Sequence, residues 1–242
     1  MISNFHKLTL LLIILCFSCD SNKNEGYKNG IVVSAKIEAS KAGIDILKQG
    51  GNAFDAMIAT DLALSVVYPN AGNLGGGGFL VYRLSDSSYG SLDYREKSPS
   101  SATKNMYLDE NGNEIEGLST SGALSIGIPG TVAGLFKVYE KYATLPLDLL
   151  FEPAIKLAEN GYILTEKQAN SLNYNRNTIN KLNDTILLFS KKFKKGDLFI
   201  NKALGKTLRL ILKNGRDEFY SGSISKNIIN YVNSRNGILK EE

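Results

Sequence analysis

Arg95, in the segment Asp93-Tyr94-Arg95-Glu96, is the side chain whose type and position best suit ligand chemistry. A guanidinium presents its N–H groups in a planar fork that matches both oxygens of a carboxylate. The segment lies at the far end of a predicted hairpin, and a run of four glycines, residues 75–78, opens that hairpin. Arg95 is therefore a candidate for a carboxylate site. From the pattern alone, an arginine after a strand more often forms an ordinary surface ion pair.

The glycine run requires an explanation of its own, because glycine loses more conformational freedom on folding than any other residue. A phosphate-binding loop opens a helix, and the Walker type ends in Lys-Ser or Lys-Thr. Here the run leads into a strand-like segment, residues 79–84, and no such lysine follows. We therefore favour close packing of the glycine backbone against a neighbouring segment.

The histidine and cysteine content excludes several mechanisms. The only histidine is His6, and the only cysteines are Cys16 and Cys19. Residues 20–242 therefore offer no imidazole base, no thiol and no disulfide, which excludes Ser-His-Asp and Cys-His catalysis and a zinc site built on His or Cys. We assign no catalytic residue and predict no metal and no cofactor.

Two other segments allow both a ligand-binding and a structural interpretation. Residues 127–131 precede a predicted helix, whose N-terminus would attract an anion, but we favour a tight strand-to-helix turn. Residues 109–114 are acidic, as in a calcium loop. An EF-hand has glycine sixth and glutamate twelfth, whereas here Gly112 is fourth and Thr120 is twelfth. We predict a turn there.

Composition and length indicate a globular protein with an ordinary core. The 242 residues are 43% hydrophobic and 21% charged, with a net charge of +4, which suits one large domain or two small ones. Basic residues cluster at 191–195, which we interpret as a solvated loop because no nucleic-acid-binding motif accompanies them. We expect no nucleic-acid partner.

Residues 1–19 have the pattern of a bacterial lipoprotein signal peptide. A basic start is followed by an apolar run, residues 8–17, that is too short to span a bilayer. The small residue Ser18 then precedes Cys19, which would become the lipidated N-terminus, and residues 20–29 form a polar linker. The alternative is an ordinary secretory signal. We expect an extracytoplasmic protein in the periplasm or outer membrane, touching the membrane only through its lipid anchor, or else a secreted one.

The elements that must position Arg95 follow from hydrophobic periodicity. A capping box at Thr165 and Gln168 predicts one helix start. The other predicted helices cover residues 35–49, 53–67, 131–142, 153–159, 203–212 and 224–232. The predicted strands cover residues 31–33, 79–84, 89–94 and 123–126. This is an α+β pattern, rich in helix in its second half, with residues 30–242 as one domain.

Five segments together resemble the γ-glutamyltransferase (γ-glutamyl transpeptidase, glutathione hydrolase) family. They are GIDILKQGGNAFDA (43–56), PNAGNLGGGGF (69–79), DYRE (93–96), GIPGTVAG (127–134) and EFYSG (218–222). The resemblance implies an N-terminal-nucleophile hydrolase with an αββα sandwich, made from a precursor that cleaves itself into a large and a small subunit. It also implies an acyltransferase and peptidase that acts on γ-glutamyl amides such as glutathione, with Arg95 holding the α-carboxylate of the glutamyl group.

The resemblance covers only the large-subunit part of that family. The family's nucleophile is a threonine in a Thr-Thr-His context, with its own α-amine as base, and this sequence has no histidine after His6. We therefore expect an incomplete sandwich and a chain that is inactive alone. It would be a fragment, a decayed copy or half of a split enzyme, and its partner would be the missing small-subunit half. The alternative is a non-catalytic extracytoplasmic lipoprotein that binds a γ-glutamyl or amino-acid ligand.

Overall fold

A computed structural model describes residues 29–183 and 187–241. The chain divides into two units, Met1–Ile31 and Val32–Glu242, and every helix and strand of the described residues belongs to the second. The signal peptide, Cys19 and most of the polar linker lie outside the described residues. Within the described part of the chain, no helix is both long and apolar enough to cross a membrane.

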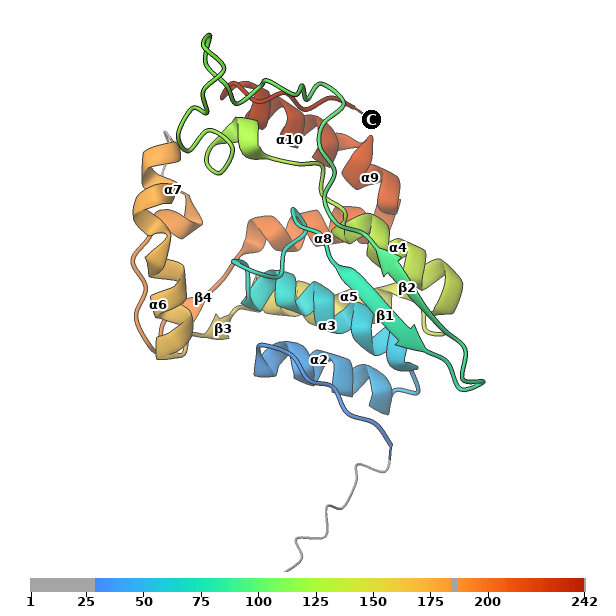
Figure 1. Ribbon diagram of the computed structural model, residues 1–242. Helices are drawn as coiled ribbons and strands as arrows, with labels where there is room; N and C mark the ends of the chain where they lie inside the picture. Colours follow the sequence, from blue (N-terminus) through green and yellow to red (C-terminus); the bar gives the residue numbers. More distant parts are fainter. Residues whose placement is uncertain (1–28, 184–186, 242) are drawn as a thin grey trace, which may run out of the picture. The chain divides into compact units, whose positions relative to one another are not determined.

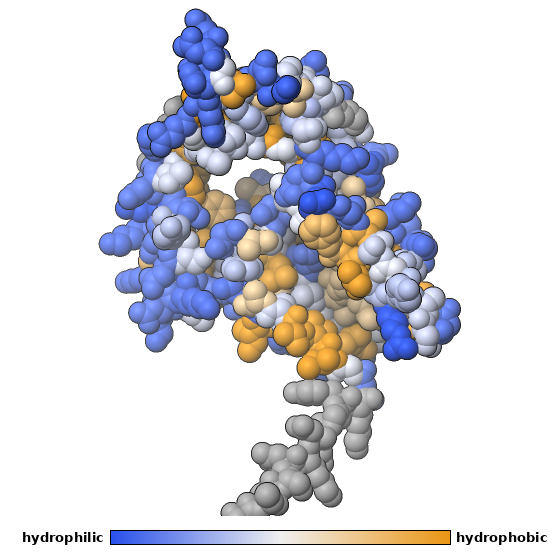
Figure 2. Space-filling model, viewed as in Figure 1, coloured by the Kyte–Doolittle hydropathy of each residue, from blue (hydrophilic) through white to orange (hydrophobic). Residues whose placement is uncertain are grey.

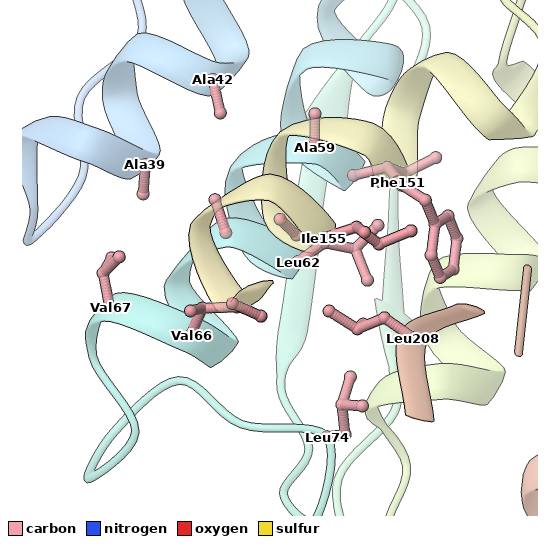
Figure 3. Packing of buried hydrophobic residues seen from close by; sticks show 14 of the residues in the cluster. Ala39, Ala42, Ala59, Leu62, Val66, Val67, Leu74, Phe151, Ile155 and Leu208 are labelled. Carbon is pink, nitrogen blue, oxygen red and sulfur yellow. The ribbon is translucent and has the colours of Figure 1, made fainter. Parts of the chain in front are cut away.

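Four helices form the centre of the fold: α2 (Ile37–Lys48), α3 (Ala53–Val67), α5 (Leu147–Asn160) and α8 (Lys202–Asn214). Helix α3 packs against both α2 and α5, and α5 packs against α8 (Figure 1). The sequence of α3 is apolar around most of its circumference, so it needs neighbours on several sides. Figure 3 shows the resulting contact layer, in which Ala39 of α2, Leu62 of α3, Ile155 of α5 and Leu208 of α8 are buried.

The start of α3 is fixed by a buried carboxylate. The predicted cap is confirmed, since Asn52 Oδ1 accepts hydrogen bonds from the backbone N–H groups of Phe54 and Asp55 at 2.7 and 3.0 Å. Asp55 is 0% exposed, and it accepts from the Asn52 N–H at 2.8 Å. It also accepts from the N–H and the hydroxyl of Thr144, at 3.0 and 2.6 Å, and from the N–H of Leu145 at 3.2 Å. This one side chain thereby joins α3 to the segment before α5.

Burial opposes ionisation of Asp55, but the hydrogen bonds from Thr144, Asn52 and Leu145 outweigh burial and hold its pKa below the ordinary value of 3.8. Asp55 is therefore a carboxylate in the folded protein at neutral pH.

The predicted hairpin is present as β1 (Phe79–Arg83) and β2 (Tyr89–Asp93), which pair antiparallel with Val81 opposite Ser91. Side chains alternate across the hairpin, as the pleat requires. Leu80 and Leu92 pack on the core, whereas the outer face carries Phe79, Val81 and Tyr89, which are 65%, 80% and 84% exposed. A second pair of strands is very short: β3 (Tyr162–Ile163) with β4 (Leu198–Phe199).

The remaining elements surround this centre (Figure 1). They are α4 (Thr131–Tyr142), α6 (Glu166–Tyr174), α7 (Arg176–Leu182), α9 (Arg216–Tyr220), α10 (Ser223–Asn233) and the 3₁₀ turns η1 (Ala123–Ser125) and η2 (Leu188–Ser190). Helix α4 has the predicted bounds, and the capping box at Thr165 and Gln168 is present.

Three predictions of secondary structure are wrong. Residues 31–33 and 123–126 form no strand, because a strand needs a paired neighbour and none lies beside them in the described residues. Ser125 and Ile126 instead bond back to Gly122 and Ala123. Helix α5 begins at Leu147 rather than at Pro153. Burial of its apolar face outweighs the hydrogen bond that a proline cannot donate.

Candidate functional site

The four glycines let the backbone run against the segment that carries Arg95. A Cβ atom at Gly77 would lie 2.5 Å from the Tyr94 carbonyl oxygen, and one at Gly78 would lie 2.9 Å from the Tyr94 ring. The Gly78 and Tyr94 backbones exchange two hydrogen bonds of 3.2 and 3.0 Å. The run leads into β1 rather than into a helix. Close packing, as favoured from the sequence, is confirmed, and the phosphate-loop alternative is wrong.

This packing predicts a sharp difference between two alanine substitutions within the run. Gly77→Ala should lower the free energy of unfolding by about 1–3 kcal/mol, because its methyl group would overlap rigid backbone. Gly75→Ala is the matched control, since a Cβ there meets only the Asn73 side chain, at 3.3 Å. Urea unfolding of both variants tests this, and equal midpoints would contradict the packing account.

The start of α4 is already satisfied by protein groups. The Gly76 carbonyl accepts from the N–H groups of Gly130 and Thr131 at 2.8 and 3.0 Å. The Tyr220 hydroxyl accepts from the Ala133 N–H at 3.0 Å and donates to the Pro129 carbonyl at 2.9 Å. Residues 127–131 therefore form a tight turn into α4, as favoured from the sequence, and protein groups already accept from three of the N–H groups there.

Arg95 follows directly on β2, and Asp93 at the end of that strand holds it in place. Arg95 Nε and Nη2 donate to the two Asp93 carboxylate oxygens at 3.3 and 3.0 Å, and the Arg95 backbone N–H donates at 3.0 Å. The guanidinium also lies over the Phe79 ring, 4.8 Å from its centroid. The hydrogen bond from the Arg95 side chain lowers the pKa of the Asp93 carboxyl below its ordinary value.

Arg95 keeps donors for a further partner. A guanidinium has five N–H groups, and Asp93 engages the edge formed by Nε and one Nη2–H. The Arg95 side chain is 61% exposed, and its outer edge, with Nη1, has no hydrogen-bond partner in the described residues. A ligand carboxylate can approach that edge while Asp93 fixes the other. The surface ion pair considered from the sequence is therefore present, and it leaves one edge of the guanidinium open.

Arg95 opens onto a groove of about 520 Å³ between β2, α4 and α9. Its charged lining residues are Asp93, Arg95, Lys97, Lys137 and Arg216. Two tyrosines, Tyr94 and Tyr220, also line it. Burial and, secondarily, the charge of Asp61 raise the pKa of Tyr94 to about 12, and burial raises that of Tyr220. Both phenols are thus neutral near pH 7, and the groove has a net positive charge.

Sequence reasoning identified Arg95 but not the groove. Asp93 could have been found, because alternate residues of a strand lie on one face and Asp93 is two residues before Arg95. Lys137 and Arg216 give no comparable signal, since they come from helices distant in the sequence.

At residues 109–114 the structure has the predicted turn: Asp109 Oδ1 accepts from the N–H groups of Asn111 and Asn113 at 2.9 and 2.8 Å. Within the described residues, no group of three or more His, Cys, Asp or Glu side chains could hold a metal ion.

Comparison with known proteins gives one consistent result. The family described as Gamma-glutamyltranspeptidase matches residues 39–242. A glutathione hydrolase proenzyme of Pseudomonas sp. (strain A14) is 43% identical over 220 residues, which cover 89% of this chain and 38% of the relative. The proenzyme of Escherichia coli (strain K12) is 40% identical over 219 residues, again covering 89% and 38%.

A solved structure matches as well. The crystal structure of Helicobacter pylori gamma-glutamyltranspeptidase superposes with a TM-score of 0.85 at 42% identity, covering 90% of this chain and 63% of that one. The chain thus spans well under half the length of the curated relatives that it matches.

Proposed function

Because the chain belongs to the γ-glutamyltranspeptidase family, an enzyme family with the N-terminal-nucleophile hydrolase fold, we propose that it supplies the α-carboxylate site of an enzyme that cleaves and transfers γ-glutamyl groups. Glutathione and related amides are the proposed donors. The observation that carries this proposal is Arg95, which is exposed, pinned along one edge by Asp93 and stacked on Phe79. A fixed guanidinium orients the glutamyl group without first losing side-chain entropy.

In this proposal the chain binds the substrate but does not cleave its amide bond. A threonine on a second segment, with its own α-amine as base, would attack the γ-amide. No residue of this chain is assigned to that step, so we expect no turnover by the chain alone. The DNA downstream of this reading frame distinguishes a split enzyme from a fragment or decayed copy, because a split enzyme requires a following Thr-Thr-His segment.

The outer face of the β1–β2 hairpin is where we place the missing half. Phe79, Val81 and Tyr89 are exposed on that face, where they lie opposite Asp93, Ser91 and Arg83. Figure 2 shows hydrophobic residues gathered over α2, α3 and β1. A two-stranded sheet with three large apolar side chains uncovered is marginal in water, and further strands packed on it would extend the sandwich.

We expect the purified chain to self-associate through this face. Val81→Lys should shift the population toward monomer in sedimentation velocity, because a charge in the centre of an apolar contact opposes its burial. Tyr174→Lys on α6 is the control, since Tyr174 is equally exposed but lies away from the hairpin. A wild-type chain that is monomeric and unfolds in a single two-state transition would contradict this expectation.

We also propose that Cys19 is lipidated and that the protein is extracytoplasmic. The alternative function is then that of a non-catalytic lipoprotein that binds a γ-glutamyl or amino-acid ligand. Cells fed labelled palmitate should incorporate it into the wild-type protein, and Cys19→Ser should abolish incorporation. Cys16→Ser is the matched control and should retain the label. Incorporation that does not depend on Cys19 would exclude the lipoprotein assignment and leave the secretory signal.

A further inference from the structure

Four cations converge on the groove from three separate parts of the chain. Arg95 and Lys97 follow β2, Lys137 lies on α4, and Arg216 begins α9. Positive side chains repel one another, so a fold that brings four of them to one hollow of about 520 Å³ needs a compensating negative charge.

The lining provides little of that negative charge. Asp93 is the only acidic side chain among the groove's described lining residues, and Arg95 already engages both of its oxygens. Arg216 Nη1 pairs with Asp217 at 2.9 Å, and Asp217 is not part of the lining. Lys97 and Lys137 have no ion pair in the described part of the chain. The lysine ammonium groups are therefore available to a ligand.

The walls of the groove are held together independently of any ligand. The Arg216 guanidinium lies 4.6 Å from the centroid of the Tyr220 ring, and the Tyr220 hydroxyl bridges the start of α4. Lys97 and Ile128 exchange backbone hydrogen bonds of 3.1 and 2.7 Å. The segments that carry these cations consequently keep their relative placement, which favours a preorganised anion site.

We propose that this groove is a subsite for carboxylates beyond the one that Arg95 holds, so that the preferred ligand is a γ-glutamyl peptide with an acidic second residue. The proposal rests on the proposed function, because Arg95 must hold the glutamyl end for the remainder of the ligand to reach the groove. Lys97 and Lys137 are the determinants of this specificity. Ammonium groups act as point charges without fixed fork geometry, so they select charge rather than one particular side chain.

Two dipeptides that differ only in charge test the proposal: γ-glutamyl-glutamate and γ-glutamyl-glutamine. Each is titrated calorimetrically into the full chain at low salt. Exposed carboxylate–lysine pairs change affinity by about threefold each, so we expect about a tenfold preference for the acidic peptide. The double variant Lys97→Gln/Lys137→Gln should remove that preference, and Lys206→Gln on α8, outside the groove, should retain it. In 1 M NaCl the preference should disappear in the wild type and in Lys206→Gln as well.

The outcomes separate this inference from the proposed function. Equal binding of the two peptides, with Arg95→Ala weakening both, overturns the subsite and leaves the carboxylate site in place. Binding of neither peptide overturns both proposals. Inorganic phosphate that competes as well as free glutamate would show a general anion groove and would also overturn the carboxylate assignment.

Discussion

Asp55→Ala is expected to lower the free energy of unfolding by about 3 kcal/mol or more, the largest stability effect that we predict. Asp55 is fully buried, and its two oxygens accept four hydrogen bonds, from Asn52, Thr144 and Leu145. Alanine would leave those donors buried without an acceptor and would loosen α3 from the segment before α5. Urea unfolding at pH 7 measures the difference.

A second variant at this position, Asp55→Asn, has a predicted pH dependence. The folded protein holds the pKa of Asp55 below its ordinary value of 3.8, so ionisation of Asp55 favours the folded state above that pH. This contribution is lost as the pH falls through the lower, folded-state pKa. The gap between wild type and Asp55→Asn should therefore be widest near neutral pH and shrink on acidification. Asp45→Asn is the control, because Asp45 forms an exposed ion pair with Lys41. A gap that does not change between pH 7 and pH 3 would contradict this assignment.

Arg95→Ala is expected to weaken binding of γ-glutamyl ligands about ten- to a hundredfold, because it removes a charge-assisted pair of hydrogen bonds to the ligand carboxylate. Calorimetry with γ-glutamyl-glutamine measures this effect. Arg95→Lys should recover only part of the affinity, since an ammonium lacks the planar fork. Arg83→Ala is the matched control, because Arg83 is exposed on the same hairpin and bonds to Ser87 rather than lining the groove.

Asp93→Asn extends the same test to the residue that positions Arg95. An amide keeps an acceptor for the Arg95 backbone N–H but loses the charge that fixes the guanidinium. Affinity should fall by less than in Arg95→Ala, with the folded structure unchanged by circular dichroism. Unaltered affinity in both variants would show that the carboxylate binds elsewhere.

The sequence was informative wherever a local pattern decides the outcome. The hairpin, the bounds of α4 and the caps at Asn52 and Thr165 all depend on residues within a few positions of one another, and they are confirmed. The family and its fold also followed from contiguous segments. The strands predicted at residues 31–33 and 123–126 are absent for the converse reason. Each would require a partner strand that the described residues do not provide.

The candidate site was predictable only at its centre. Arg95 was identified from its type and place, whereas the groove depends on Lys137 and Arg216, which tertiary packing of α4 and α9 brings beside it. The role of Tyr220 could not be predicted from the sequence either. The sequence marks EFYSG as a motif, but only the structure places its hydroxyl between the Pro129 carbonyl and the Ala133 N–H.

The central proposal is that this chain binds the glutamyl carboxylate and that the nucleophile belongs to another segment. Release of product from a γ-glutamyl anilide by the purified chain, alone and mixed with a complementary segment that carries the Thr-Thr-His sequence, tests it most directly. We predict no release by the chain alone and release by the mixture, which Arg95→Ala should reduce. Turnover by the chain alone that persists through repeated purification would contradict the account.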